Sequence, residues 1–163
     1  MEKENVKSNV LALDCATTTG WAVAVEGRLA EYGEIRLKAG ECDLWAFLTE
    51  ITAKYGITHI VAEGAFYDEK KKNIKTFERL SNFHGVMHLF SQLNGLKFTS
   101  EGYQPTQWKR TLTCNAYATK EQVKDYVNNM LRRLDPRHQN IQSDNITDAI
   151  GIYLAWWKRQ LLR

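Results

Sequence analysis

The N-terminal part of the chain carries short apolar stretches separated by polar turns. Their pattern predicts strands over 10–14, 20–26 and 30–37. Such close spacing predicts antiparallel hairpins, because a parallel crossover needs about a dozen residues or more. The first of these stretches is apolar up to its last residue, Asp14, which predicts a buried strand that ends on a carboxylate.

The rest of the chain has mostly helical spacing of its apolar residues. In 43–55 the apolar residues recur with a helical period, and Gly56 follows as a stop signal. Three antiparallel strands, then helix, strand, helix, strand and further helices, predict an α/β protein with a ribonuclease H-like fold. Such a fold has a mixed five-stranded sheet, three strands antiparallel and then two parallel, flanked by helices. The remaining predicted strands cover 57–63 and 98–103, and the helices cover 43–55, 70–93, 106–112, 119–134 and 144–161.

Composition limits the organisation and the compartment of the protein. The length of 163 residues predicts one domain over 10–163 after a polar lead-in at 1–9. The net charge of +3, from 22 basic and 19 acidic residues, permits a polyanionic partner. The three cysteines lack Cys-x-x-Cys spacing, which favours reduced thiols over a disulfide framework. No apolar run approaches the roughly 20 residues of a membrane span. We therefore expect a soluble, cytoplasmic protein with no membrane partner.

Acidic residues stand where a two-metal phosphodiesterase needs ligands: Asp14, Glu63, Asp144 and Asp148. Asp14 and Glu63 end predicted buried strands, and a carboxylate in such a run is costly unless something pairs with it. Asp144 and Asp148 share one face of the last predicted helix. Carboxylate oxygens from separate elements are natural ligands for Mg²⁺, with Mn²⁺ as a substitute. Two such ions stabilise both the attacking and the leaving oxygen of a phosphodiester.

Each of these acids also has a plain structural interpretation. Glu63 is compatible with a carboxylate bonded to backbone amides, and Asp144 with a helix N-cap. The spacing Asp-x-x-x-Thr-x-Gly from Asp14 to Gly20 also resembles the first phosphate loop of actin-like ATPases and sugar kinases. Those enzymes hold a nucleotide between two duplicated domains, and this chain has room for one.

Aromatic and basic residues accompany the acids and suggest a nucleic acid partner. Phe66 and Tyr67 suit stacking on unpaired or distorted bases, with core packing as the alternative. One lysine cluster opens a predicted helix, where its positive charge opposes the helix dipole. Contact with phosphate would relieve this unfavourable interaction. The alternative is a helix start that is simply solvated. A second basic set would balance charge on a scissile phosphate, unless these are plain surface residues. The two sets are Lys70, Lys71, Lys72 and Lys75, and Lys109, Arg110 and Lys120.

Taken in order, these segments resemble RuvC-type Holliday junction resolvases over nearly the whole chain. In that family a first strand carries Asp before Thr-Gly-Tyr/Trp-x-Val, and a later strand ends in Glu with a Phe three residues on. A helix then carries Lys-Asn and Gly-Val. Val-Lys follows, with a downstream Lys before Gln-Val, and the last motif is a late Asp-Ala. Their order and spacing together are specific, although no single motif is. They correspond here to Asp14 with 19–23, Glu63, Phe66, Lys72-Asn73, Gly85-Val86, Trp108-Lys109, Lys120 with 121–123, and Asp148-Ala149.

The resemblance implies roles for several residues. It implies metal ligands, a junction-wedging aromatic and two functional lysines. It also implies a homodimer, because a two-fold symmetric junction needs two sites related by a two-fold axis. In that order the implied residues are Asp14, Glu63 and Asp148, then Phe66, then Lys109 and Lys120.

The chain departs from the family pattern at three places. The family usually has Asp or His three residues before its last Asp, where this chain has Asn145, so Asp144 is expected to serve as the fourth ligand. The usual glycines of the turn between the two lysines are Cys114 and Ala116 here, and a proline after the first Asp is replaced by Cys15-Ala16. These departures look more like a phage or mobile-element resolvase than the standard bacterial one.

We therefore expect a homodimeric, Mg²⁺-dependent endonuclease with two ions per site that cuts four-way junctions and other branched DNA by symmetric hydrolysis. Two alternatives stay open. One is a ribonuclease H-like nuclease that acts on RNA–DNA hybrid. The other is a non-catalytic branched-DNA-binding protein, which Asn145 suggests and which retention of Asp14, Glu63 and Asp148 argues against.

Overall fold

The computed structural model describes residues 8–65, 69–70 and 74–162. Most of the predicted lead-in at 1–9 therefore lies outside the described residues. The strands form one sheet in the order β3-β2-β1-β4-β5. β1, β2 and β3 are antiparallel neighbours, whereas β4 is parallel to β1 and β5 to β4, so the predicted mixed topology is confirmed. The strands are β1 Val10–Asp14, β2 Thr18–Val25, β3 Arg28–Arg36, β4 His59–Ala62 and β5 Lys97–Thr99.

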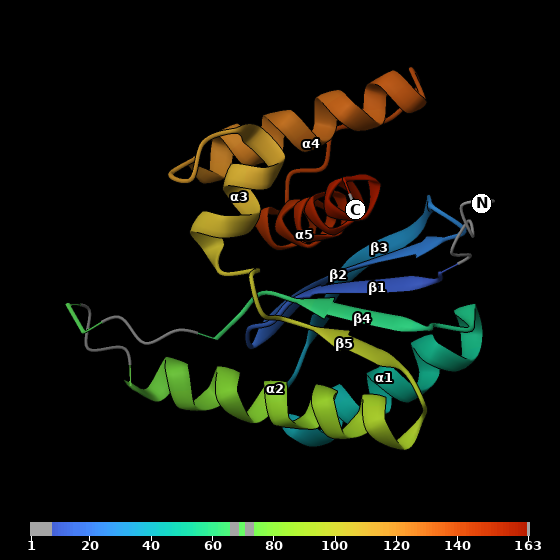
Figure 1. Cartoon of the computed structure of the whole chain (residues 1–163), viewed down its shortest axis with the longest axis vertical. Helices are drawn as coiled ribbons and strands as arrows, with labels where there is room; N and C mark the ends of the chain where they lie inside the picture. Colours follow the sequence, from blue (N-terminus) through green and yellow to red (C-terminus); the bar gives the residue numbers. More distant parts are fainter. Residues whose placement is uncertain (1–7, 66–68, 71–73, 163) are drawn as a thin grey trace.

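Helices cover both faces of this sheet, as Figure 1 shows. Two helices pack on one face, and the other three form a layer on the opposite face. Within that layer α5 packs directly on β1 and β2, while α3 and α4 pack on α5. The first pair is α1 Glu41–Tyr55 and α2 Ile74–Leu93, and the layer opposite contains α3 Pro105–Thr113, α4 Lys120–Leu134 and α5 Asp144–Leu161. No helix in the described ranges is long and apolar enough to cross a membrane.

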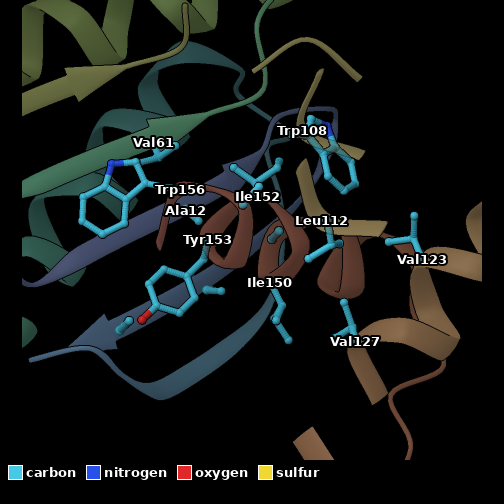
Figure 2. Packing of buried hydrophobic residues seen from close by; sticks show 14 of the residues in the cluster. Ala12, Val61, Trp108, Leu112, Val123, Val127, Ile150, Ile152, Tyr153 and Trp156 are labelled. Atoms are coloured by element: carbon cyan, nitrogen blue, oxygen red, sulfur yellow. The ribbon is translucent and has the colours of Figure 1, made fainter. Parts of the chain in front are cut away.

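The side-chain alternation of β1 divides the core in two. Val10 and Ala12 belong to the cluster beneath α5, and Leu11 and Leu13 belong to the cluster with α1 and α2. Both clusters are fully covered, which explains why β1 has an unbroken apolar run. Figure 2 shows the α5 side of the core, where Trp108 of α3 stands at one edge with its nitrogen on the side away from Leu112.

The bounds of some elements differ from the prediction. The strand predicted over 98–103 is limited to Lys97–Thr99, because a turn follows in which Tyr103 N–H donates to Ser100 O at 3.1 Å and Gly102 has φ 78°. The helix predicted over 70–93 is described from Ile74 onward, and 71–73 lie outside the described residues. The last helix has the predicted bounds, 144–161.

Candidate active site

Asp14 and Glu63 leave the sheet on the same side at the ends of neighbouring strands. Asp14 is the last residue of β1, and Glu63 follows the last residue of β4. The two strands are parallel, and Glu63 N–H donates to Leu13 O at 3.3 Å. The residues two positions before each acid, Ala12 and Val61, belong to the core beneath α5. Because side chains alternate along a strand, both carboxylates also face α5.

Gly20 allows the start of α5 to approach this strand end. It lies opposite Asp14 in β2, and a Cβ added at Gly20 would be 1.9 Å from the carbonyl oxygen of Asn145. A side chain at this position would therefore push α5 off the sheet. Asp148 lies one helical turn after the start of α5, so the close approach brings its carboxylate to the ends of β1 and β4.

Burial raises the pKa of all three carboxyl groups. Burial raises the pKa of Asp14 well above its usual value, and the charges of Glu63 and Asp148 raise it further. Burial also raises the pKa of Glu63 to about 7, although a hydrogen bond from Trp108 opposes this rise. The pKa of Asp148 rises to about 6 through burial, opposed by Lys109 and by Lys120. Partly buried acids of this kind stay ionised at neutral pH only where nearby positive charge compensates them.

The donor set fits a hard divalent cation. Asp148 Oδ1 is buried and accepts no hydrogen bond from the described residues, which is unusual for a carboxylate oxygen. Oxygen ligands from three separate elements suit Mg²⁺ or Mn²⁺. Within residues 8–65, 69–70 and 74–162, no three His, Cys, Asp or Glu side chains already form a metal cage. Asp14, Glu63 and Asp148 therefore share one electrostatic environment without a preformed coordination sphere.

Lys109 and Lys120 reach this acidic site from two different helices. Lys109 belongs to α3 and Lys120 opens α4, and both lower the pKa of Asp14 and of Asp148 through their charge. Thr119 fixes the start of α4 with a capping box. Arg110 is exposed on α3. The fold thus brings the two predicted lysines, far apart in sequence from Asp14, within electrostatic range of the acids.

The fourth predicted ligand, Asp144, is bound to α4. Its Oδ1 lies 2.8 Å from Lys124 Nζ and its Oδ2 lies 3.8 Å from Lys120 Nζ. The hydrogen bond from Lys124 holds the pKa of Asp144 below its usual value. Asn145, the competing position, donates from Nδ2 to Glu34 Oε1 of β3 at 2.9 Å. Both side chains therefore already have partners on neighbouring elements.

The predicted DNA-binding residues are only partly described. Lys70 and Lys75 are exposed, whereas Phe66, Tyr67, Lys71 and Lys72 lie outside the described residues. A groove of about 390 Å³ lies between α2 and the loop after Asp14. In it Arg79 Nη1 donates to Thr17 Oγ1 at 2.5 Å. The charged residues that line this groove are the bases Lys38, Lys75 and Arg79 and the acids Glu41 and Glu78.

Sequence reasoning did not single out three residues that contact the acids. Trp108 Nε1–H donates to Glu63 Oε2 at 2.7 Å, and His84 Nε2 lies 2.7 Å from the Glu63 carbonyl oxygen. The third is Lys124, the partner of Asp144. A buried indole needs an acceptor for its N–H, but nothing in the sequence indicates that Glu63, 45 positions away, provides it.

Comparison with known proteins identifies the family. A sequence model of the family described as crossover junction endodeoxyribonuclease RuvC matches residues 16–156. The curated crossover junction endodeoxyribonuclease RuvC of Campylobacter lari is 32% identical over 136 residues, covering 80% of each chain. The chain belongs to this RuvC family. The family match begins just after Asp14, whose placement rests on the geometry of β1 described above.

Solved RuvC structures have the same fold as this family member. The Thermus thermophilus RuvC structure has a TM-score of 0.74 at 20% identity, over 94% of this chain and 96% of that one. T. thermophilus RuvC in complex with a Holliday junction substrate has a TM-score of 0.74 at 18% identity, over 95% and 96%. The yeast mitochondrial Holliday junction resolvase Ydc2 has a TM-score of 0.63 at 14% identity, over 96% and 81%. The predicted ribonuclease H-like fold is confirmed, while the phage or mobile-element source stays a prediction.

Proposed function

We propose that this RuvC-family protein is a homodimeric, Mg²⁺-dependent endonuclease that cuts four-way DNA junctions by hydrolysing one phosphodiester in each of two strands. The observation that carries the proposal is the convergence of Asp14, Glu63 and Asp148 at one end of the sheet, where burial and then the charges of Glu63 and Asp148 raise the pKa of Asp14. Membership of the RuvC family and the solved complex of T. thermophilus RuvC with a Holliday junction support the choice of substrate.

The acids and the lysines have different roles at the scissile phosphate. Asp14, Glu63 and Asp148 would hold two Mg²⁺ ions, with Asp144 as a fourth ligand once it leaves Lys124. Two bound Mg²⁺ ions activate the attacking water and stabilise the leaving oxygen. Lys109 and Lys120 are held close to the acids and would balance the negative charge of the phosphate. Asp14, Glu63 and Asp148 are each partly buried, which strengthens these charge interactions relative to bulk water.

Contacts outside the site would position the junction. In the groove beside the loop after Asp14, Lys38, Lys75 and Arg79 outnumber the two lining acids, Glu41 and Glu78, and would contact the phosphates of one arm. The predicted contacts of Phe66, Tyr67, Lys70, Lys71 and Lys72 would extend this surface, with the aromatics stacking on bases at the branch point.

The outer face of α2 supports the homodimer. Gly85, Leu89 and Leu93 recur every four residues along it, so they share one face of the helix. Leu89 is 51% exposed and Leu93 is 69% exposed, and a Cβ at Gly85 would meet nothing within 4 Å. A second copy of the helix would cover these apolar side chains. Sedimentation equilibrium should report a dimer, and Leu89→Glu should shift it toward monomer.

A cleavage assay on matched substrates tests the function. The panel comprises a four-way junction, a Y-fork, an RNA–DNA hybrid and linear duplex, each with and without Mg²⁺. We expect paired nicks in opposite strands of the junction only when Mg²⁺ is present. Preferred cutting of the hybrid would replace the proposal with a ribonuclease H-like activity. Tight junction binding without cleavage in Mg²⁺ or Mn²⁺ would indicate a non-catalytic binder.

A further inference from the structure

A short hydrogen bond joins a core tryptophan to one of the acids. Trp108 is fully buried, and its Nε1–H donates to Glu63 Oε2 at 2.7 Å. This distance is typical of a hydrogen bond to a charged acceptor. The indole nitrogen is a donor only, so it can neither remove a proton from water nor bind a metal. Any influence of Trp108 on the chemistry must therefore act through the carboxylate of Glu63.

The fold makes room for this indole. A Cβ at Gly151 of α5 would lie 2.9 Å from Trp108 Cζ3 and 3.1 Å from Leu112 Cδ2. Glycine inside a helix costs about 1 kcal/mol relative to alanine, so it is favoured here only because the ring packs against it. Leu112 lies on the side of the ring away from its nitrogen (Figure 2). The ring thus has one orientation, with its N–H toward the acids.

We propose that Trp108 is a positioning residue that fixes the carboxylate of Glu63 for metal binding. Its N–H occupies one oxygen, Oε2, and leaves Oε1 for the ion, so Glu63 acts as a monodentate ligand. Without the indole, the carboxylate would rotate about its last torsion and lose part of its preorganisation. Groups that orient a metal ligand in this way typically contribute about 10–100-fold to affinity or activity.

Trp108 stands directly before Lys109, where the resolvase motif that this sequence resembles has Val, whose side chain has no hydrogen-bond donor. The inference rests on the proposed function of Glu63 as a metal ligand and adds a residue that supports it.

The first test compares Trp108→Phe, which keeps an aromatic ring and removes the donor, with Trp156→Phe. Trp156 is buried in the same core and contacts His59 and Tyr153. Calorimetric titration with Mn²⁺ alone should give a dissociation constant at least about tenfold higher for Trp108→Phe and unchanged for Trp156→Phe. Junction affinity without metal should be unchanged in both. A folded Trp108→Phe protein that binds Mn²⁺ as tightly as wild type would overturn the proposal.

The second test needs no metal and observes the hydrogen bond of Trp108 directly. In a ¹H–¹⁵N spectrum the Trp108 indole signal, assigned by its loss in Trp108→Phe or by through-space contacts to Gly151, should lie downfield and exchange slowly. Glu63→Ala should move it upfield and speed its exchange, whereas Glu50→Ala, an exposed acid of α1, should leave it in place. If Glu63→Ala left the chemical shift and the exchange rate of the indole N–H unchanged, the hydrogen bond on which the role depends would be refuted.

The two proposals fail in different ways. If wild-type protein does not cut junctions while Trp108→Phe still weakens Mn²⁺ binding, the proposed substrate is wrong and the positioning role stands. If wild-type protein cuts junctions and Trp108→Phe leaves Mn²⁺ binding and the Mg²⁺ requirement unchanged, the positioning role alone is wrong.

Discussion

Asp144 of α5 is paired with Lys124 of α4, at 2.8 Å between Oδ1 and Nζ, so the last predicted metal ligand is bound to a neighbouring helix. An ammonium group at this distance provides positive charge that a divalent ion would otherwise supply. The Asn145 side chain also has a partner, because its amide donates a hydrogen bond to Glu34. For either residue to reach a metal, it must first leave a partner on the surface of the fold.

Between these two residues, Asp144 should matter more for metal binding. A hard cation favours a charged oxygen over a neutral amide. Asp144→Asn should therefore raise the Mg²⁺ concentration needed for half-maximal cleavage by about tenfold, much more than Asn145→Ala. Lys124→Gln should lower it, because Asp144 is released. Should the first two variants show the reverse order, Asn145 is the ligand and Asp144 only ties α5 to α4.

Removal of a core acid should separate binding from cleavage. Asp14→Asn or Asp148→Asn should reduce junction cleavage by about a thousandfold or more. Binding should survive or tighten, because the loss of a negative charge reduces repulsion of phosphate. Glu50→Gln, on the exposed side of α1, serves as the control and should cut at the wild-type rate. Substantial cleavage by either core variant would contradict the assignment of the site.

The site was predictable from local sequence only in part. Asp14, Glu63 and Asp148 stand out because a carboxylate next to an apolar run is costly, and strand alternation then places two of them on one face. Periodicity also gave the bounds of α5. The partners of Asp144 and Asn145 were not predictable, because Lys124 and Glu34 come from other elements and only the packing of α5 brings them close. The same limit applies to Trp108 and Glu63, which are 45 positions apart.

Lys120 should act on cleavage more than on binding. Its charge reaches Asp148 and Asp14, so Lys120→Ala should slow cleavage by about 10²-fold, a typical value for loss of one electrostatic contact to the transition state. Lys75→Ala lies outside the site and should weaken junction binding and reduce the slope of log affinity against log salt by about 1. Preserved turnover in Lys120→Ala, measured under single-turnover conditions, would remove its role at the phosphate.

His59 should make the protein sensitive to acid. Burial, with a smaller effect of Lys97, lowers the pKa of His59 to about 4, and its Nε2 lies 2.8 Å from Thr99 Oγ1. The unfolded chain binds this proton below about pH 6.5 and the folded chain does not, so stability falls as pH drops from about 6.5 to 4. His59→Gln should flatten the Tm profile in that window, whereas His88→Gln, at an exposed position, should not. If the profiles of Tm against pH ran parallel for His59→Gln and wild type, the proposed effect of His59 on acid stability would be wrong.

The acidic site should destabilise the metal-free protein at neutral pH. Burial raises the pKa of Glu63 to about 7, so the folded state holds its proton more tightly than the unfolded state, in which the pKa is about 4.5. The corresponding stability is present below about pH 4.5 and is lost as pH rises through 7. Glu63→Gln should therefore raise Tm in chelator at pH 8 by about 2 °C or more, and the gain should vanish near pH 4.5. Added Mg²⁺ should stabilise wild type more than the variant, because only the carboxylate offers a charged ligand. The opposite result would be a wild-type protein that is more stable than Glu63→Gln in chelator at pH 8. In that case Trp108 and the nearby lysines already compensate the charge of Glu63, and the site does not need a cation for stability.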